Sequence, residues 1–138
     1  MNRTDLQVLA DIRVADAEAL LEAGRWAAAY YLVGYAVECG LKACAARRIR
    51  EHDVPERSFV NGFYTHRFDE LLRISGFVSF LIEQNSKDPQ FRENWETLDD
   101  WNEALRYNPD VTEEEARDLF AAVSDPLHGV LPWLKTLW

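Results

Sequence analysis

Residues Arg25 to Arg48 read RWAAAYYLVGYAVECGLKACAARR, and this stretch decides the fold. It is rich in Ala and Leu, two of the strongest helix formers. Apolar residues fall on nearly every side of a helical projection, so we expect a long, buried helix from Arg25 to about Glu51. Glu38 and Lys42 interrupt the apolar run, which argues against a membrane span.

Four side chains that are capable of chemistry share one narrow stripe of this helix: Tyr31, Tyr35, Glu38 and Lys42. At about 100° per residue they fall within about 60° of one another. Glu38 and Lys42 are spaced i,i+4 in the favourable order, which predicts an ion pair worth about 0.3–0.5 kcal/mol. Because the helix is apolar elsewhere, the stripe indicates a polar seam set into a buried element. The alternative is an ordinary ion pair beside half-buried phenols.

Helical periodicity continues through the rest of the chain, and no segment alternates like a strand. Asp88-Pro89 is a preferred helix start, and Thr112 with three following glutamates has the pattern of a capping box. Pro126 either kinks the last helix or restarts it with Ser124 as the cap. Besides 25–51, helices are predicted at 4–23, 66–75, 77–84, 89–107 and from 112 onward, with a loop at 53–64. The sequence thus predicts a single all-α domain over residues 1–138, an antiparallel helical bundle of about five helices.

The composition is that of a globular domain with an acidic surface. Apolar residues make up 48% of the 138 residues, and the net charge is −9. A negative field disfavours nucleic-acid backbones unless cations cluster. Arg47, Arg48 and Arg50 form one cluster, which is either a solvated helix end or a phosphate-binding patch. The polar N-terminal residues lack the apolar core of a signal peptide, so a cytoplasmic protein with no membrane association is expected.

The cysteines and histidines do not show the spacing of a metal site. Cys39 and Cys44 lie about 140° apart around the predicted helix, so they are interpreted as small buried hydrophobes rather than a disulfide. No metal or cofactor is predicted from the chain. His66 follows a capping Thr, where both a surface role and a functional role remain open. His52 and His128 are interpreted as structural or exposed.

Specific residues at fixed spacing carry a resemblance to a known family. Residues 24–43 contain GRW, AYY, GY, a single E and LKA in that order. In these residues the chain resembles HEPN domains, small helical domains of bacteria, archaea and higher eukaryotes that often pair with small nucleotidyltransferases. Further similar segments are Thr65-His66, Trp101 to Tyr107 and Val130 to Leu134. The resemblance covers nearly the whole chain and implies a HEPN-like fold.

Many HEPN domains are metal-independent ribonucleases, and the resemblance implies what such a site would require. Their Arg and His lie late in the chain with about four to six residues between them, usually doubled across a homodimer. In such a site His relays protons and Arg stabilises the phosphorane charge. Here Arg106 has no His at that spacing, and Arg117 is followed only by the distant His128. The one match in spacing, Arg47 with His52, lies at the end of the second helix, so strong ribonuclease activity is not expected.

Three hypotheses for function remain open, and whether the chain is an enzyme is not decided. The first is a non-catalytic nucleotide- or partner-binding module. Any nucleotidyltransferase it acts with would be a separate chain, since this one has no Gly-Ser motif followed by paired aspartates and no Gly-rich phosphate loop. The second is a metal-independent ribonuclease, the toxin of a toxin–antitoxin pair, with a variant Arg/His site and RNA as its ligand. The third gives the stripe a packing role only.

The candidate polar groove consists of Tyr31, Tyr35, Glu38, Lys42, His66, Arg106 and Tyr107. Because buried charges must be paired, Glu38 and Lys42 are expected to interact, and one of them is expected to contact the Arg106–Tyr107 segment. The chain is also rich in aromatic residues, and Trp133 and Trp138 lie in an apolar segment that one small bundle does not cover fully. Aromatic side chains are enriched at interface cores, so a homodimer is predicted.

Overall fold

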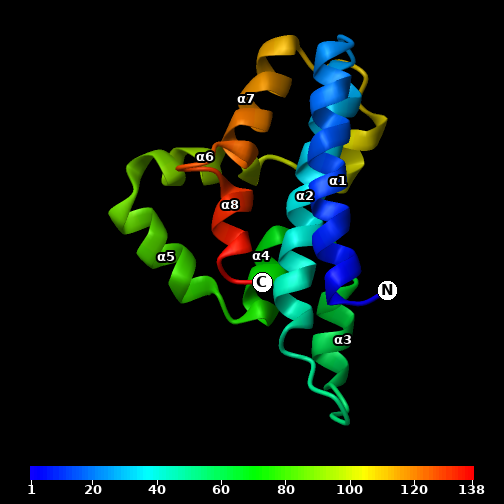
Figure 1. The fold of residues 1–138 in the computed structure, drawn as a ribbon, viewed down its shortest axis with the longest axis vertical. Helices are drawn as coiled ribbons and strands as arrows, with labels where there is room; N and C mark the ends of the chain where they lie inside the picture. Colours follow the sequence, from blue (N-terminus) through cyan, green and yellow to red (C-terminus); the bar gives the residue numbers. More distant parts are fainter.

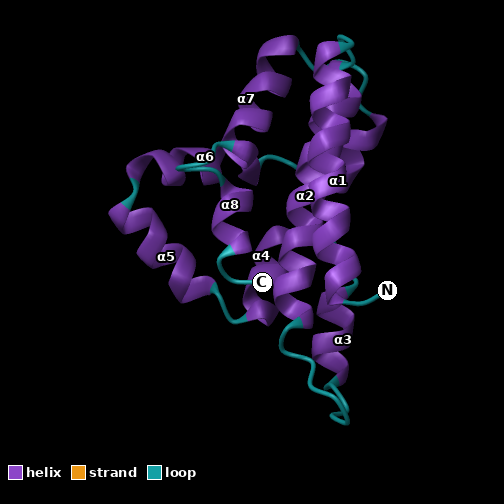
Figure 2. Ribbon diagram, in the orientation of Figure 1, coloured by secondary structure: helices purple, strands orange, loops and turns teal.

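The structure, a computed structural model that describes all 138 residues, contains helices and no strands (Figure 1, Figure 2). The all-α prediction is therefore confirmed. In chain order the elements are α1 (Arg3–Glu22), α2 (Trp26–Ala46), α3 (Arg57–Phe63), α4 (Phe68–Ser75), α5 (Val78–Lys87), α6 (Pro89–Asp99), the 3₁₀ helix η1 (Glu103–Tyr107), α7 (Glu113–Ser124) and α8 (Val130–Lys135). The predicted count of about five helices was wrong, because several segments between the long helices form short helices of their own.

The two longest helices, α1 and α2, form a hairpin that runs along the long axis of the molecule (Figure 1). Gly24 makes the turn between them with a φ of 72°, a conformation that glycine adopts without strain. α2 is the central element, since it packs against α1, α4, α7 and α8. Twelve of its 21 residues are buried, as the sequence predicts. Despite its apolar character, neither α2 nor any other helix has the length and apolarity that a membrane crossing requires.

The core is one cluster that several helices share around α2. Leu41 of α2 is fully buried together with Leu71 of α4, Phe91 of α6, Leu119 of α7 and Leu134 of α8. Burial of each such side chain stabilises the fold by about 1.5–3 kcal/mol relative to its exposure. The short C-terminal helices are thus fixed to the bundle by apolar contacts rather than by their own length.

Two predicted helix starts are confirmed in atomic detail. The carboxylate of Asp88 accepts a hydrogen bond from the N–H of Phe91 at 3.1 Å, and Pro89 is the first residue of α6. The hydroxyl of Thr112 accepts a hydrogen bond from the N–H of Glu115 at 3.1 Å at the start of α7. Both caps satisfy backbone donors that a helix cannot satisfy internally.

The segment 53–64 was predicted to be a loop, and this was wrong because it contains α3. The pair Asn61-Gly62 has the composition of a turn, but here it lies within the helix. A Cβ atom on Gly62 would lie 2.9 Å from a methyl group of Ile74. The glycine therefore allows α3 to approach α4 closely, and tertiary packing overrides the local turn signal.

The predicted helix over 89–107 was also too long. α6 ends at Asp99, and Trp101 then turns inward to a buried position with 4% of its surface exposed. The remainder of the segment forms η1, with the side chain of Asn102 as its cap. In the last segment, α7 ends at Ser124 and α8 begins only at Val130, so both predicted alternatives, a kink at Pro126 and a restart there with Ser124 as the cap, were wrong.

α5 lies at the side of the molecule, away from the α1–α2 hairpin (Figure 1). It contacts mainly α6, and none of its residues is buried. Phe80 and Ile82 of this helix remain 45% and 62% exposed. α5 is therefore attached to the bundle far more weakly than the central helices are.

Candidate functional site

Glu38 is the centre of the predicted polar stripe, and only 1% of its surface is exposed. Its Oε1 atom lies 2.8 Å from Nζ of Lys42 and 2.9 Å from Nδ1 of His66. The predicted interaction of Glu38 with Lys42 is confirmed. His66 comes from the segment before α4, so this one carboxylate oxygen joins two parts of the chain that are 28 residues apart.

His66 lies at the surface end of this cluster, since 46% of its side chain is exposed. An ionised carboxylate can only accept hydrogen bonds, so the Nδ1–H group of His66 donates this hydrogen bond to Oε1 of Glu38. The other ring nitrogen, Nε2, has no hydrogen-bond partner within the chain. Glu38 therefore fixes the orientation and tautomer of a histidine whose second nitrogen can meet a ligand or a partner.

Two buried polar atoms at this site have no hydrogen-bond partner: Oε2 of Glu38 and Nε1 of Trp101. A buried donor or acceptor without a partner costs about 1–3 kcal/mol. Such atoms are uncommon in native proteins, and each calls for an explanation, such as a functional role or a bound water or ion. Their presence distinguishes this cluster from an ordinary surface ion pair.

Aromatic rings cover one side of the cluster. The indole of Trp101 stacks on Phe68 with ring centroids 5.2 Å apart and on Tyr31 at 5.8 Å. Tyr31 in turn lies parallel to Tyr35, with centroids 6.3 Å apart. The absence of a side chain at Gly34 is what admits the indole, since a Cβ atom there would overlap its ring. The sequence did not identify Trp101 or Phe68 as parts of the site.

Two ionisable groups at this site, the Tyr35 phenol and the Cys39 thiol, have raised pKa values that favour their neutral forms. Burial raises the pKa of the Tyr35 phenol, and the neighbouring Cys39 and Glu38 raise it further. Burial also raises the pKa of the Cys39 thiol to about 11, with a further contribution from Glu38. Cys39 and Cys44 are both buried and free, as predicted. Neither thiol is therefore suited to act as a nucleophile.

Arg106 and Tyr107 lie on η1, which packs against α2. The guanidinium of Arg106 lies 4.8 Å from the ring centroid of Tyr107. The phenol groups of Tyr107 and, to a smaller extent, Tyr31 raise the pKa of Arg106 by favouring its charged form. No hydrogen bond or ion pair joins Arg106 or Tyr107 to Glu38 or Lys42, so the predicted second contact of the ion pair is made instead by His66.

The structure thus gathers the seven predicted groove residues, with Trp101 added, around one side of α2. We call this set the seam face: Tyr31, Tyr35, Glu38, Lys42, His66, Trp101, Arg106 and Tyr107. None of the four main hollows of the molecular surface includes any of these residues. The seam face is consequently a surface rather than a deep pocket.

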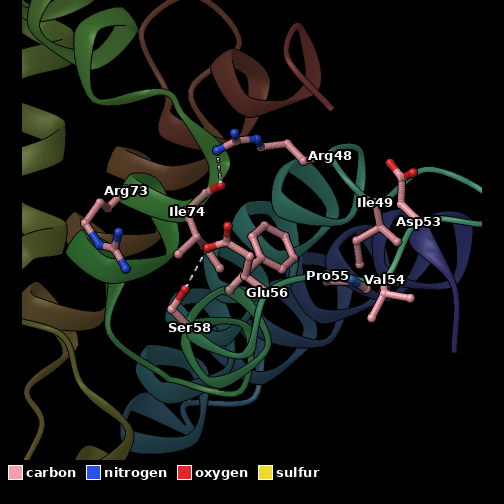
Figure 3. Close-up of a pocket in the computed structure, with 10 residues that line it drawn as sticks. Arg48, Ile49, Asp53, Val54, Pro55, Glu56, Ser58, Arg73 and Ile74 are labelled. Atoms are coloured by element: carbon pink, nitrogen blue, oxygen red, sulfur yellow. Dashed lines mark hydrogen bonds between the residues drawn. The ribbon is translucent and has the colours of Figure 1, made fainter.

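One of the hollows, with a volume of about 460 Å³, lies between the end of α2 and α3 (Figure 3). Its lining includes two arginines, Arg48 and Arg73, and two acids, Asp53 and Glu56. Arg73 is already paired with Glu70 at 2.6 Å. Arg48, Asp53 and Glu56 form no ion pair, but two cations and two acids leave the lining without net charge, so this hollow does not favour a charged ligand of either sign.

The other two histidines lie outside the seam face. His52 is 88% exposed and has a φ of 72°, while Arg47 donates to the carbonyl of Leu137, so the Arg47–His52 spacing does not form a joint site. His128 lies 2.8 Å from the carboxylate of Asp88. That hydrogen bond raises the pKa of His128 and lowers the pKa of Asp88. As predicted, these two histidines have exposed or structural positions.

Comparison with known proteins assigns no family to the chain. No family model, no curated protein and no solved structure matches it. The similarity to HEPN domains consequently rests on the quoted residues alone, and function has to be inferred from the geometry of the seam face.

Proposed function

We propose that the chain is a non-catalytic binding module in which the seam face binds a second copy of the chain, forming a homodimer. In this proposal the dimer acts with a separately encoded nucleotidyltransferase, as the resemblance to HEPN domains suggests. The observation that carries the proposal is the buried Glu38 carboxylate, which holds His66 and Lys42 in position on a face that lies outside the four main hollows.

The shape and composition of the seam face support a protein partner over a small ligand. Small-molecule sites are usually concave and bury most of the ligand. Protein interfaces, in contrast, are broad and are anchored by Tyr, Trp and Arg. The seam face has this composition, and its Tyr107 is 76% exposed. A partner would cover this ring together with the adjacent guanidinium of Arg106.

The test is the mass of the purified chain in solution, measured by light scattering over a concentration series. We expect a dimer for the wild type and a dissociation constant raised about tenfold or more by Arg106→Glu or Tyr107→Ala, as for hot-spot residues. Arg92→Glu is the matched control, because it makes the same change of charge on the exposed side of α6. A wild type that stays monomeric at all concentrations would refute the proposed interface. Binding of a nucleotide to the monomeric seam face would replace it with a ligand site.

A second function, the metal-independent ribonuclease, is favoured by one observation. The hydrogen bond from His66 to Glu38 is the arrangement that prepares a histidine for proton transfer. In such a reaction Nε2 of His66 would accept the proton of a ribose 2′-hydroxyl as that oxygen bonds to phosphorus. The bond from phosphorus to the 5′-oxygen would break, and that oxygen would leave as a hydroxyl protonated by water, with a 2′,3′-cyclic phosphate as the other product. Arg106 would stabilise the charge on the phosphorane. The net charge of −9 opposes RNA binding and keeps this candidate second.

This alternative is tested by incubating the purified chain with single-stranded and structured RNA in the presence of a metal chelator. We expect no strong cleavage. Cleavage that persists in Arg47→Ala/His52→Ala but is lost in His66→Ala and Arg106→Ala would establish the ribonuclease instead. The reverse pattern would place the activity at the end of α2.

A further inference from the structure

A second site lies at the C-terminal end of α2, in a hollow of about 770 Å³ that we call the arginine hollow. It is bordered by the segment after α2, the end of α4 and the start of α5. The lining side chains that carry charge or an aromatic ring are Arg47, Arg48, Arg50, Asp53, Phe77 and Phe80. Three cations face one carboxylate here, which is a local positive charge on a chain whose net charge is −9.

The arginines of the hollow have no acidic partners. Eight of the 15 Lys and Arg side chains form ion pairs, and none of the three arginines is among them. Four other cations also lack an ion pair, so the distinguishing feature is that three unpaired cations lie around one hollow. Three unpaired guanidinium groups around one hollow therefore point to an anion that comes from outside the chain.

Two of the three arginines are held in place by backbone carbonyls. Arg48 donates to the carbonyl of Ile74 at 2.8 Å, as Figure 3 shows, and Arg47 donates to the carbonyl of Leu137 at 2.8 Å. Each bond occupies one of the five N–H donors of a guanidinium. These bonds account for Arg47 and Arg48 as caps of helix ends, but they leave most of the donors free, and Arg50 makes no side-chain hydrogen bond at all.

Aromatic rings adjoin the cations. Phe77 and Phe80 meet edge to face with ring centroids 5.4 Å apart, and 45% of Phe80 is exposed. An exposed ring beside guanidinium groups can stack on a planar ring of a ligand whose phosphates bind the arginines. The chemistry of the hollow therefore matches a ligand with two parts, a phosphate group and a flat ring.

We propose that the arginine hollow binds an organic phosphate that carries a planar ring, with the phosphates on Arg47, Arg48 and Arg50 and the ring against Phe80. The site is separate from the seam face, because Cys44 in its lining lies about 200° around α2 from Lys42. The proposal does not depend on the function proposed for the seam face.

The experiment is a titration of the full chain by calorimetry with ADP as the probe and pyrophosphate as the ring-free comparison. We expect ADP to bind at one site and pyrophosphate to bind more weakly, since it lacks the ring. Arg50→Glu should weaken binding of both probes about tenfold or more, as loss of charge-assisted hydrogen bonds does. Phe80→Ala should weaken ADP and leave pyrophosphate unchanged. Arg57→Glu, an equal change of charge on exposed α3, is the control and should leave both affinities near the wild type.

Three results would overturn the proposal, and one control checks folding. No binding of either probe would exclude the site. Equal weakening by Arg50→Glu and Arg57→Glu would show only a response to the overall charge of the chain. A normal circular dichroism spectrum for Arg50→Glu ensures that lost binding is not lost folding. ADP binding that shifts the indole N–H resonance of Trp101 and is insensitive to Arg50→Glu would move the ligand to the seam face.

Discussion

Replacement of Gly34 by Ala tests the close contact on which the seam face is built. A Cβ atom at this position would overlap three atoms of the Trp101 indole, closer than Cβ atoms are ever found to side chains. The indole has little freedom to move, because it is buried and stacked between Phe68 and Tyr31. The added methyl group should therefore displace Trp101 and the η1 segment that follows it.

The expected change in the free energy of unfolding follows from two opposing effects. Ala is favoured over Gly in a helix interior by about 0.5–1 kcal/mol, whereas overpacking of a filled core costs about 1–3 kcal/mol. Gly40→Ala is the matched control in the same helix. Its Cβ would meet only methyl groups of Leu134 and Leu131, at 3.1 and 3.2 Å, and these can shift by a few tenths of an ångström. Both variants gain the same helix propensity, so Gly34→Ala should be less stable than Gly40→Ala by about 1–3 kcal/mol.

Urea unfolding followed by circular dichroism measures the two free energies of unfolding, and the denaturant slope should stay unchanged. The double variant Gly34→Ala/Trp101→Phe, with a smaller ring, should be more stable than the sum of the two single changes predicts. If Gly34→Ala proves as stable as Gly40→Ala, the indole is free to move, and the rigid aromatic cover described for the seam face is refuted.

Two further predictions concern the other polar contacts. A double-mutant cycle of Glu38→Gln with His66→Gln should give a coupling energy of about 0.5–3 kcal/mol, whereas Glu38→Gln with Arg106→Ala should be additive to within about 0.5 kcal/mol; the opposite pattern would show that Arg106 and not His66 is the second partner. The raised pKa of His128 means that its protonated form stabilises the fold. This stabilisation is complete below pH 6.5, the ordinary pKa of histidine, and is lost as the pH rises through the raised pKa. The lowered pKa of Asp88 stabilises the fold above pH 3.8, and this stabilisation is lost as the pH falls. Thermal unfolding should thus show the largest deficit for His128→Gln between about pH 4 and 6.5, and a deficit independent of pH would contradict the ion pair.

Local signals in the sequence sufficed for the fold class and for several helix ends. The apolar surroundings of the stripe predict that α2 is buried, and Asp88-Pro89 and Thr112 mark helix starts because they supply acceptors for backbone donors within three residues. Gly62 shows the limit of such signals. With Asn61 it predicts a turn, yet Gly62 lies inside α3, where it allows close packing against Ile74 of α4. That packing depends on how the two helices are arranged in space.

The candidate site was predictable in the same measure. The ion pair of Glu38 and Lys42 lies within one helix turn, so the helical period alone identifies it. The contact of Glu38 with His66 spans 28 residues that include α3, and it depends on how α4 packs against α2, which has no local signature in the sequence. Trp101 was missed as part of the site for the related reason that its position depends on where α6 ends. The sequence therefore identified which residues carry charge at the seam face, but not which of them meet across it.

The weak attachment of α5 has a consequence for the motions of the molecule. A helix without buried side chains loses little free energy when it detaches, so its amide hydrogens should exchange with solvent through local opening and not through global unfolding. The α1–α2 hairpin, in contrast, can open only with the core. The chain should consequently behave as two cooperative units of unequal stability, and insertions or protease cuts within residues 78–87 should leave the larger unit folded.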